Sequence, residues 1–172
     1  PSPASGEAGG GPHEGRTVRR PAPAGAGPPL RLGGVEIPHP RGLEGHSDGD
    51  VLLHAIASAL LGALGAGDLG RHWPSSDPSL RGISSGRILA EVAARVRAAG
   101  YAIGNVDATV IAQEPRLAPH LEKMAAQVAA LLGVDGDRVN VKATSTDGLG
   151  SIGRGEGIAA QAVALLLGPE PA

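Results

Sequence analysis

The chain has 172 residues and a formal net charge of −2, which allows one ordinary domain with a tail and argues against a strongly basic nucleic-acid surface. It contains no cysteine, so disulfides and thiolate metal ligands are excluded, and any metal must bind to His and carboxylate side chains. Aromatic residues make up 1% of the sequence, which argues against a base-stacking platform. No apolar run approaches the length of a membrane span, and residues 1–29 lack the apolar stretch of a signal peptide. We therefore expect a cytoplasmic protein with no nucleic-acid or membrane partner.

The N-terminal part of the chain, residues 1–29, is rich in Gly, Pro, Ala and Arg and shows no hydrophobic period, which is typical of a disordered tail. We expect order to begin near Leu30, with a domain over residues 30–168 and a short tail over 169–172. Apolar and polar residues alternate over residues 30–37 on both sides of Gly33-Gly34, which predicts a strand with a bulge or tight turn. The chain begins with Pro rather than Met, which fits a piece of a longer polypeptide.

The stretch from His46 to His54 holds two imidazoles, two carboxylates and a hydroxyl ahead of an apolar helix. Ser47 is placed to cap that helix, and Asp50 three residues later can complete a capping box. His54 falls one helical turn after Asp50, on the same face. A His and a carboxylate at this spacing can share a divalent cation or hold each other's orientation. Two interpretations therefore remain, a metal or catalytic site and a plain helix start.

The other elements follow from hydrophobic period and turn residues. Apolar positions at helical spacing predict helices from about Asp48 to Leu64, from Ser84 or Ser85 to Gly100, and over residues 119–133. Alternation and bounding glycines predict strands over residues 101–113, 138–143 and 158–167. This order predicts an α/β fold, an α+β sandwich in one small domain, with one mixed sheet and helices on one face.

Two loop regions have the composition of phosphate sites. Residues 65–70 are glycine-rich and lead into a polar, turn-rich segment over residues 73–78. Residues 144–157 begin with three hydroxyls and a carboxylate and continue through five glycines with Arg154 among them. Exposed N–H groups, hydroxyls and an Arg are what a phosphate site needs. Helix ends and surface loops have much the same composition, so that alternative stays open.

Seven short motifs follow one another along the chain, namely 33–38 (GGVEIP), 46–50 (HSDGD), 68–70 (DLG), 105–107 (NVD), 112–115 (AQ.P), 141–144 (VKAT) and 153–157 (GRGEG). In this order and spacing they resemble the 2-C-methyl-D-erythritol 2,4-cyclodiphosphate synthase family over roughly residues 30–168. The resemblance implies conversion of 4-CDP-2-C-methyl-D-erythritol 2-phosphate to the 2,4-cyclodiphosphate and CMP. This intramolecular phosphoryl transfer, a phosphorus-oxygen lyase reaction, belongs to non-mevalonate isoprenoid biosynthesis.

The resemblance also implies cofactors, an assembly and residue roles. Zn²⁺ or another divalent cation is expected, with Mg²⁺ or Mn²⁺ on the substrate diphosphate, in a homotrimer whose active sites lie between subunits. His46 and Ser145 are implied as catalytic residues, His54 as a zinc ligand and Asp147 as a magnesium ligand. Contacts to the substrate phosphates and the methylerythritol part are implied for His46, Ser47, Asp68, Leu69, Gly70, Trp73, Pro74, Ser75, Ser76 and Asp77. Contacts to the cytidine diphosphate are implied for Ala112, Gln113, Glu114, Pro115, Arg116, Leu117, Ala118, Thr144, Ser145, Thr146 and Asp147, and further substrate contacts for Ser151 and Arg154.

The N-terminus departs from the family, which opens with a Gly-x-Asp-x-His segment whose Asp and His are two of three protein zinc ligands. No Asp precedes Asp48 here, and the context of His13-Glu14 does not match that motif. One imidazole is expected to bind zinc poorly, because such a site needs three protein ligands. Two alternatives to the enzyme therefore stay open. One is a non-catalytic trimeric homologue that binds CDP-like or isoprenoid diphosphate ligands, and the other is a metal-free, mutase-like enzyme on a similar fold.

A shifted reading frame is one hypothesis for the residues before about Pro29. The sequence Val18-Arg19-Arg20-Pro21 can be encoded GTA-CGA-CGT-CCN, which one base later contains the codons for Tyr-Asp-Val. The next triplet cannot encode His without a further change. Sequencing the gene tests this hypothesis, and an intact frame with no coding potential for Asp-x-His upstream of Leu30 would sink it.

Overall fold

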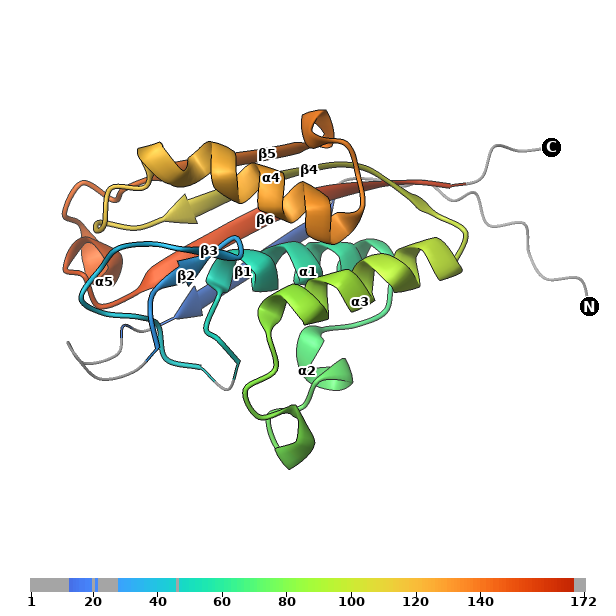
Figure 1. Ribbon diagram of the computed structural model, residues 1–172, viewed down its shortest axis with the longest axis horizontal. Helices are drawn as coiled ribbons and strands as arrows, with labels where there is room; N and C mark the ends of the chain where they lie inside the picture. The colour runs from blue at the N-terminus through green and yellow to red at the C-terminus, as the bar shows by residue number, and fades with distance from the viewer. Residues whose placement is uncertain (1–12, 20, 22–27, 46, 169–172) are drawn as a thin grey trace, which may run out of the picture.

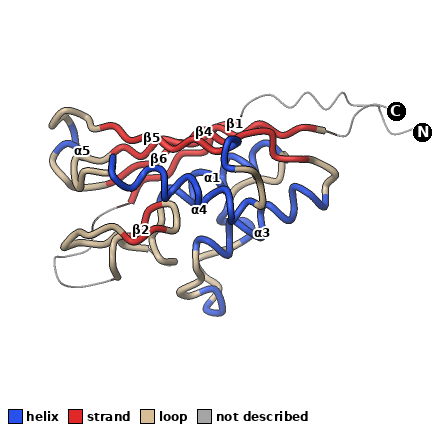
Figure 2. Tube along the Cα trace, turned by 45° about the horizontal axis from the view of Figure 1, so that its top comes forward, coloured by secondary structure: helices blue, strands red, loops and turns tan. Residues whose placement is uncertain are grey.

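A four-stranded mixed sheet forms one layer of the molecule and helices cover one of its faces (Figures 1 and 2). The computed structural model describes residues 13–19, 21, 28–45 and 47–168. The strand order is β1 (His13–Arg19), β6 (Ile158–Leu167), β4 (Ala102–Ile111), β5 (Val139–Thr144). β4 and β5 run parallel, whereas β6 is antiparallel to both β1 and β4. The predicted mixed sheet with helices on one face is confirmed.

The core lies between this sheet and three helices. The helix α1 (Val51–Ala63) contacts β1 and β6, α4 (Leu121–Leu132) contacts β5, and α3 (Ser85–Ala98) packs beside both helices. Alternate residues of β6, namely Ala160, Ala162 and Ala164, are buried. Their small side chains let α1 approach the sheet closely, which suits a core almost free of aromatic residues.

The sheet gains a strand from a segment that we expected to be disordered. Residues 13–19 pair with β6 over their whole length, from His13 beside Ala164 to Arg19 beside Ile158. The expectation of a disordered tail is therefore wrong for these seven residues. Strand pairing uses backbone N–H and C=O groups, so a segment without hydrophobic period can still complete the open edge of a sheet. The remaining tail residues, apart from Pro21, Pro28 and Pro29, lie outside the described part of the chain.

The expected strand over residues 30–37 is a small separate hairpin. Its strands β2 (Arg31–Leu32) and β3 (Val35–Glu36) are antiparallel and form their own two-stranded sheet. Gly33 and Gly34 have φ angles of 62° and 75°, the left-handed values that a tight two-residue hairpin turn requires. The predicted tight turn is therefore present, but the hairpin does not join the main sheet.

A buried carboxylate links this hairpin to α1 by hydrogen bonds. Asp50 accepts hydrogen bonds from the backbone N–H groups of Gly33 (3.0 Å), Gly34 (2.7 Å) and Leu53 (3.1 Å), and it is fully buried. Burial raises its pKa from 3.8 to about 6, against the opposing effect of the three N–H donors. Asp50 is the N-cap of α1, so the prediction that Ser47 caps this helix is wrong.

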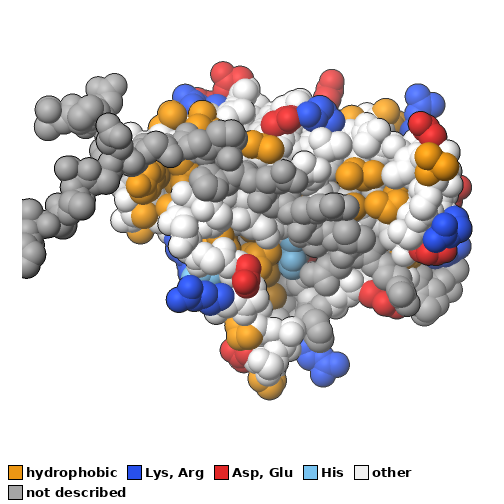
Figure 3. All heavy atoms as spheres, turned by 180° about the vertical axis from the view of Figure 1, so that it is seen from behind, with side chains coloured by type: hydrophobic (Ala, Val, Ile, Leu, Met, Phe, Trp, Pro, Cys, Tyr) orange, Lys and Arg blue, Asp and Glu red, His pale blue; other side chains and the backbone are white. Residues whose placement is uncertain are grey.

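The remaining elements are short. They are the helices α2 (Leu69–His72) and α5 (Gly150–Gly153) and the 3₁₀ turns η1 (Pro78–Leu80), η2 (Ala118–His120) and η3 (Gly136–Arg138). No helix in the described ranges has the length and apolar character needed to span a membrane. Seen from behind, hydrophobic side chains gather in patches and most charged side chains lie toward the rim (Figure 3).

Candidate active site

A cavity of about 530 Å³ lies between the start of α1, the α2 loop and the start of α3. Its walls combine small hydroxyls, backbone and apolar side chains, and they include most of the residues that the sequence implied for the methylerythritol part. The lining residues from that set are Ser47, Leu69, Gly70, Trp73, Pro74, Ser75, Ser76 and Asp77, and His54, implied as a zinc ligand, lines the cavity with them. The cavity is completed by Pro78, Leu80, Arg81, Ile83 and Ile88, which sequence reasoning missed. His46 lies outside the described residues.

Two aspartates of the implied set shape the loop around this cavity. Asp68 does not line the cavity but caps α2, accepting a hydrogen bond from the Arg71 N–H at 2.9 Å. Asp77 caps η1 and accepts from the Ser79 N–H (2.9 Å) and hydroxyl (2.7 Å). These hydrogen bonds, the hydroxyl one foremost, hold the pKa of Asp77 below its usual value. An ionised carboxylate can only accept hydrogen bonds. Asp77 therefore suits the hydroxyl donors of a diol and not a phosphate, whose oxygens are acceptors too.

His54, near the start of α1, takes part in a network of hydrogen-bonded hydroxyl groups. Its Nε2 lies 3.1 Å from Ser47 Oγ and 3.0 Å from Ser85 Oγ. The buried Ser85 hydroxyl donates a short hydrogen bond to Asp48, whose other oxygen accepts the Ser85 N–H at 3.1 Å. Ser85 therefore offers its oxygen lone pair to His54, which assigns a hydrogen to Nε2. Ser85 is 31 positions from His54, so no local spacing in the sequence could have revealed this contact.

The described residues do not fit the zinc centre implied by the resemblance. Among them, no group of three or more His, Asp or Glu side chains lies close enough together to hold a metal ion. A zinc site needs three protein ligands beside its substrate or water. His54 directs Nε2 at two hydroxyls instead, and the sequence holds no Asp-x-His pair upstream of Leu30.

We expect the purified chain to hold much less than one zinc per chain after dialysis. The physical reason is that the described residues offer zinc no set of three ligands, which a tetrahedral site needs. Elemental analysis of the wild type beside His54→Ala measures this, and the two proteins should contain equal residual zinc. A stoichiometric zinc content that disappears in His54→Ala would contradict the prediction.

The loops implied for the cytidine diphosphate meet at the carboxyl ends of the parallel strands β4 and β5. The Ala112 N–H donates to the Thr144 carbonyl at 3.0 Å, and the Gly148 N–H donates to Gln113 Oε1 at 3.1 Å. Residues 112–118 and 144–147 are therefore neighbours in space, as expected if they bind one ligand.

The hydroxyl-rich loop is organised around Asp147. Its backbone is left-handed (φ 52°), and its carboxylate accepts from the Ser145 hydroxyl at 3.1 Å. The Asp147 N–H in turn donates to Ser145 Oγ at 3.2 Å, and Thr146 Oγ1 donates to the Leu149 carbonyl at 2.7 Å. Ser145 and Asp147 are both exposed and so open to a ligand. A lone carboxylate suits Mg²⁺ that is held mainly by substrate phosphates and water.

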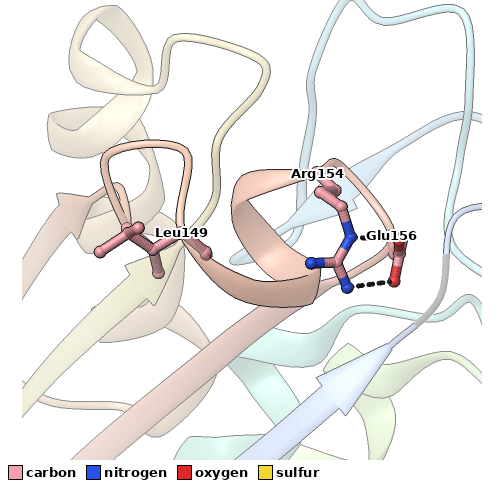
Figure 4. A network of polar contacts seen from close by, with 4 residues as sticks. Leu149, Arg154 and Glu156 are labelled. Atoms are coloured by element: carbon pink, nitrogen blue, oxygen red, sulfur yellow. Dashed lines mark hydrogen bonds and ion pairs between the residues drawn. The ribbon is translucent and has the colours of Figure 1, made fainter.

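Arg154 lies next to this loop, just after α5, and is paired with Glu156. Its Nε and Nη2 donate to the two carboxylate oxygens at 2.6 Å and 3.2 Å, and Leu149 lies on the same segment (Figure 4). The pair raises the pKa of Arg154 further above its usual value. Arg154 also lines a second cavity of about 220 Å³ with Gln113 and Glu114. A phosphate at Arg154 would have to compete with Glu156. Ser151 lies exposed in α5.

The two halves of the implied site lie apart within one chain. The α2 loop projects below the helical layer, whereas α5 lies at the left end of the sheet (Figure 1). The cavity beside His54 and the loops at the ends of β4 and β5 share no lining residue. Within one copy of the chain, the two halves therefore line different cavities.

A protein-family model described as the YgbB family matches residues 18–167 of the chain. The chain belongs to the YgbB family. Among the relatives of this YgbB protein, the 2-C-methyl-D-erythritol 2,4-cyclodiphosphate synthase of Stutzerimonas stutzeri is 57% identical over 145 residues, covering 84% of this chain and 92% of the relative. That of Thiobacillus denitrificans is 59% identical over 137 residues, covering 80% and 86%.

Solved structures of similar proteins agree with this assignment. The CDP complex of IspF from Plasmodium falciparum superposes with a TM-score of 0.80 at 30% identity, covering 92% of this chain and 96% of that one. The bifunctional IspDF from Campylobacter jejuni gives a TM-score of 0.85 at 39% identity. There the match covers 90% of this YgbB chain but 41% of the bifunctional protein.

Proposed function

We propose that the chain converts 4-CDP-2-C-methyl-D-erythritol 2-phosphate to 2-C-methyl-D-erythritol 2,4-cyclodiphosphate and CMP, a step of non-mevalonate isoprenoid biosynthesis. The observation that carries this proposal is the identity of 57% with a synthase of that name over 92% of the relative's length. The fold likeness to a CDP complex supports a cytidine nucleotide as part of the ligand.

The reaction is an exchange of one phosphorus–oxygen bond for another. An oxygen of the 2-phosphate forms a bond to the β-phosphorus, and the bond from that phosphorus to the bridging oxygen breaks, so that CMP leaves with the electron pair. Two anions must be held in line and their charge stabilised. In the proposal, the His54 cavity holds the methylerythritol part, with Asp77 accepting from its hydroxyls. The Ser145 hydroxyl and neighbouring N–H groups then hold the diphosphate.

The cofactors of this step belong to the proposal as well. Asp147 would help to hold Mg²⁺ or Mn²⁺, which would supply positive charge to neutralise the substrate diphosphate. The predicted zinc is not assigned a role, because the described residues do not fit a zinc site.

We also propose a homotrimer with active sites between neighbouring subunits, a proposal supported by the two halves of the site lining different cavities of one chain. The helix-free face of the sheet supports self-association, because it carries half-buried Val163 and Leu165 and a polar cluster. In that cluster Asp107 accepts from Lys142 (2.6 Å) and Asn140 (2.8 Å). Partial burial acts to raise the pKa of Asp107, but these hydrogen bonds outweigh it and hold the pKa below its usual value.

The test is to incubate the purified chain with the CDP-linked substrate, Mg²⁺ and added Zn²⁺. We expect CMP and the cyclic diphosphate in equal amounts, with CMP followed by chromatography and the cyclic product by ³¹P NMR. No CMP above a protein-free control, from a folded protein of trimer mass in ultracentrifugation, would contradict the proposal.

The second candidate is a non-catalytic trimer that binds CDP-like or isoprenoid diphosphate ligands. It is favoured by one observation, the lack of a zinc ligand set among the described residues. Calorimetric titration with CDP beside the CMP assay separates the two candidates, because this alternative predicts binding of CDP without any CMP release from the substrate, whereas the synthase shows both.

A further inference from the structure

The α2 loop, which forms one wall of the candidate cavity, packs on the hydrophobic core through the partly buried side chains of Leu69 and Trp73. α2 has four residues and η1 has three, and neither contains a fully buried residue. Between them the segment 73–77 lines the cavity. Such short turns do not hold a fixed position by their own hydrogen bonds, so the contacts of their side chains decide where the loop lies.

Arg95, from the last turn of α3, makes two contacts with this loop. Its guanidinium carbon lies 4.8 Å from the centre of the Trp73 ring, in a cation–π arrangement. Its Nη1 lies 2.7 Å from Nδ1 of His72, and Nε2 of His72 lies 2.8 Å from the Ala66 carbonyl. Arg95 therefore connects α3 to two consecutive residues of the loop.

The hydrogen-bonding partners of His72 determine which of its two ring nitrogens carries the hydrogen. The Ala66 carbonyl can only accept, so Nε2 carries the hydrogen; Arg95 can only donate, so Nδ1 presents its lone pair. Both ring nitrogens are thus engaged. The His72 and Trp73 rings meet at 58° with centroids 5.7 Å apart. A lysine could place a charge over Trp73, but it lacks the planar fork that reaches both rings at once.

We propose that Arg95 is a positioning residue that holds Trp73, through the cation–π contact and the His72 hydrogen bond, in the wall of the substrate cavity. Arg95 does not line the cavity itself, whereas Trp73 does. This inference rests on the proposed function of the cavity as the site of the methylerythritol part. It gives a role to the last turn of α3, whose first turn already lines the cavity through Ile88.

Trp73 is the only tryptophan of the chain, so its fluorescence reports on this contact directly. Arg95→Ala should shift the emission to longer wavelength and increase acrylamide quenching, because the ring loses its cover. In the synthase assay the same variant should raise KM by about three- to tenfold and change kcat less than about twofold. Arg95→Lys should recover only part of both changes.

The matched control is Arg87→Ala, which removes another exposed arginine of α3, paired only with Glu91 at 2.9 Å. It should leave emission, quenching and KM unchanged, and circular dichroism should show all three variants folded. Wild-type emission and KM in Arg95→Ala, or equal effects in Arg87→Ala, would overturn the inference. If the wild type releases no CMP, the proposed function fails, but the fluorescence comparison still decides whether Arg95 positions Trp73.

Discussion

Replacing Asp50 by Ala should lower the free energy of unfolding by on the order of 3–5 kcal/mol. The substitution leaves three backbone N–H donors, those of Gly33, Gly34 and Leu53, without their acceptor in a fully buried site. It also removes the N-cap of α1. Urea unfolding followed by circular dichroism at pH 7.5 measures the loss, and a change below about 1 kcal/mol would contradict this role for Asp50.

The same carboxyl should make stability depend on pH in a way that Asp50→Asn abolishes. Its pKa is raised from 3.8 to about 6 in the folded protein, so the folded state takes up a proton more readily than the unfolded state. The stabilising contribution of this proton uptake is complete below pH 3.8 and is lost as the pH rises through 6. Between pH 7.5 and 4.5 the wild type should gain about 2 kcal/mol relative to Asp50→Asn. A difference that stays constant, or changes in the opposite direction, would show that burial does not raise this pKa.

The sequence was a good guide to the helix-covered sheet because each of its elements has a clear local signal. Apolar residues alternate along residues 102–111 and recur at helical spacing from Ile88 to Val96. Each pattern marks the buried face of its own element, and both elements form as predicted. β1 could not be found in this way, because its pairing with β6 is made by the backbone. The choice of Ser47 as the cap failed for another reason. Asp50 caps the helix by accepting from the Leu53 N–H, and the same carboxylate also accepts from Gly33 and Gly34, 16 to 17 residues away, a contact that no local capping rule contains.

Only those residues of the candidate site that belong to a motif or are implied by the family resemblance could be predicted. The motifs and the resemblance implied the hydroxyl loop from Thr144 to Asp147 and most of the cavity around His54, and the structure groups each set in space. Ser85 and Arg95 stayed hidden, because α3 brings them to the site from 31 and 23 positions away from their partners. His46 lies outside the described residues, so its role stays a prediction.

A mixing experiment tests most directly whether the two halves join between neighbouring copies of the chain. His54→Ala removes part of the wall that positions the methylerythritol part, and Ser145→Ala removes a donor to the diphosphate, so each variant alone should lose CMP release by about a hundredfold. The two variants are co-expressed with different tags, and assemblies carrying both tags are purified. A trimer with two chains of one kind and one of the other contains one undamaged site out of three, so about one third of wild-type activity should return. Mixed assemblies that remain as inactive as either variant alone would contradict the account.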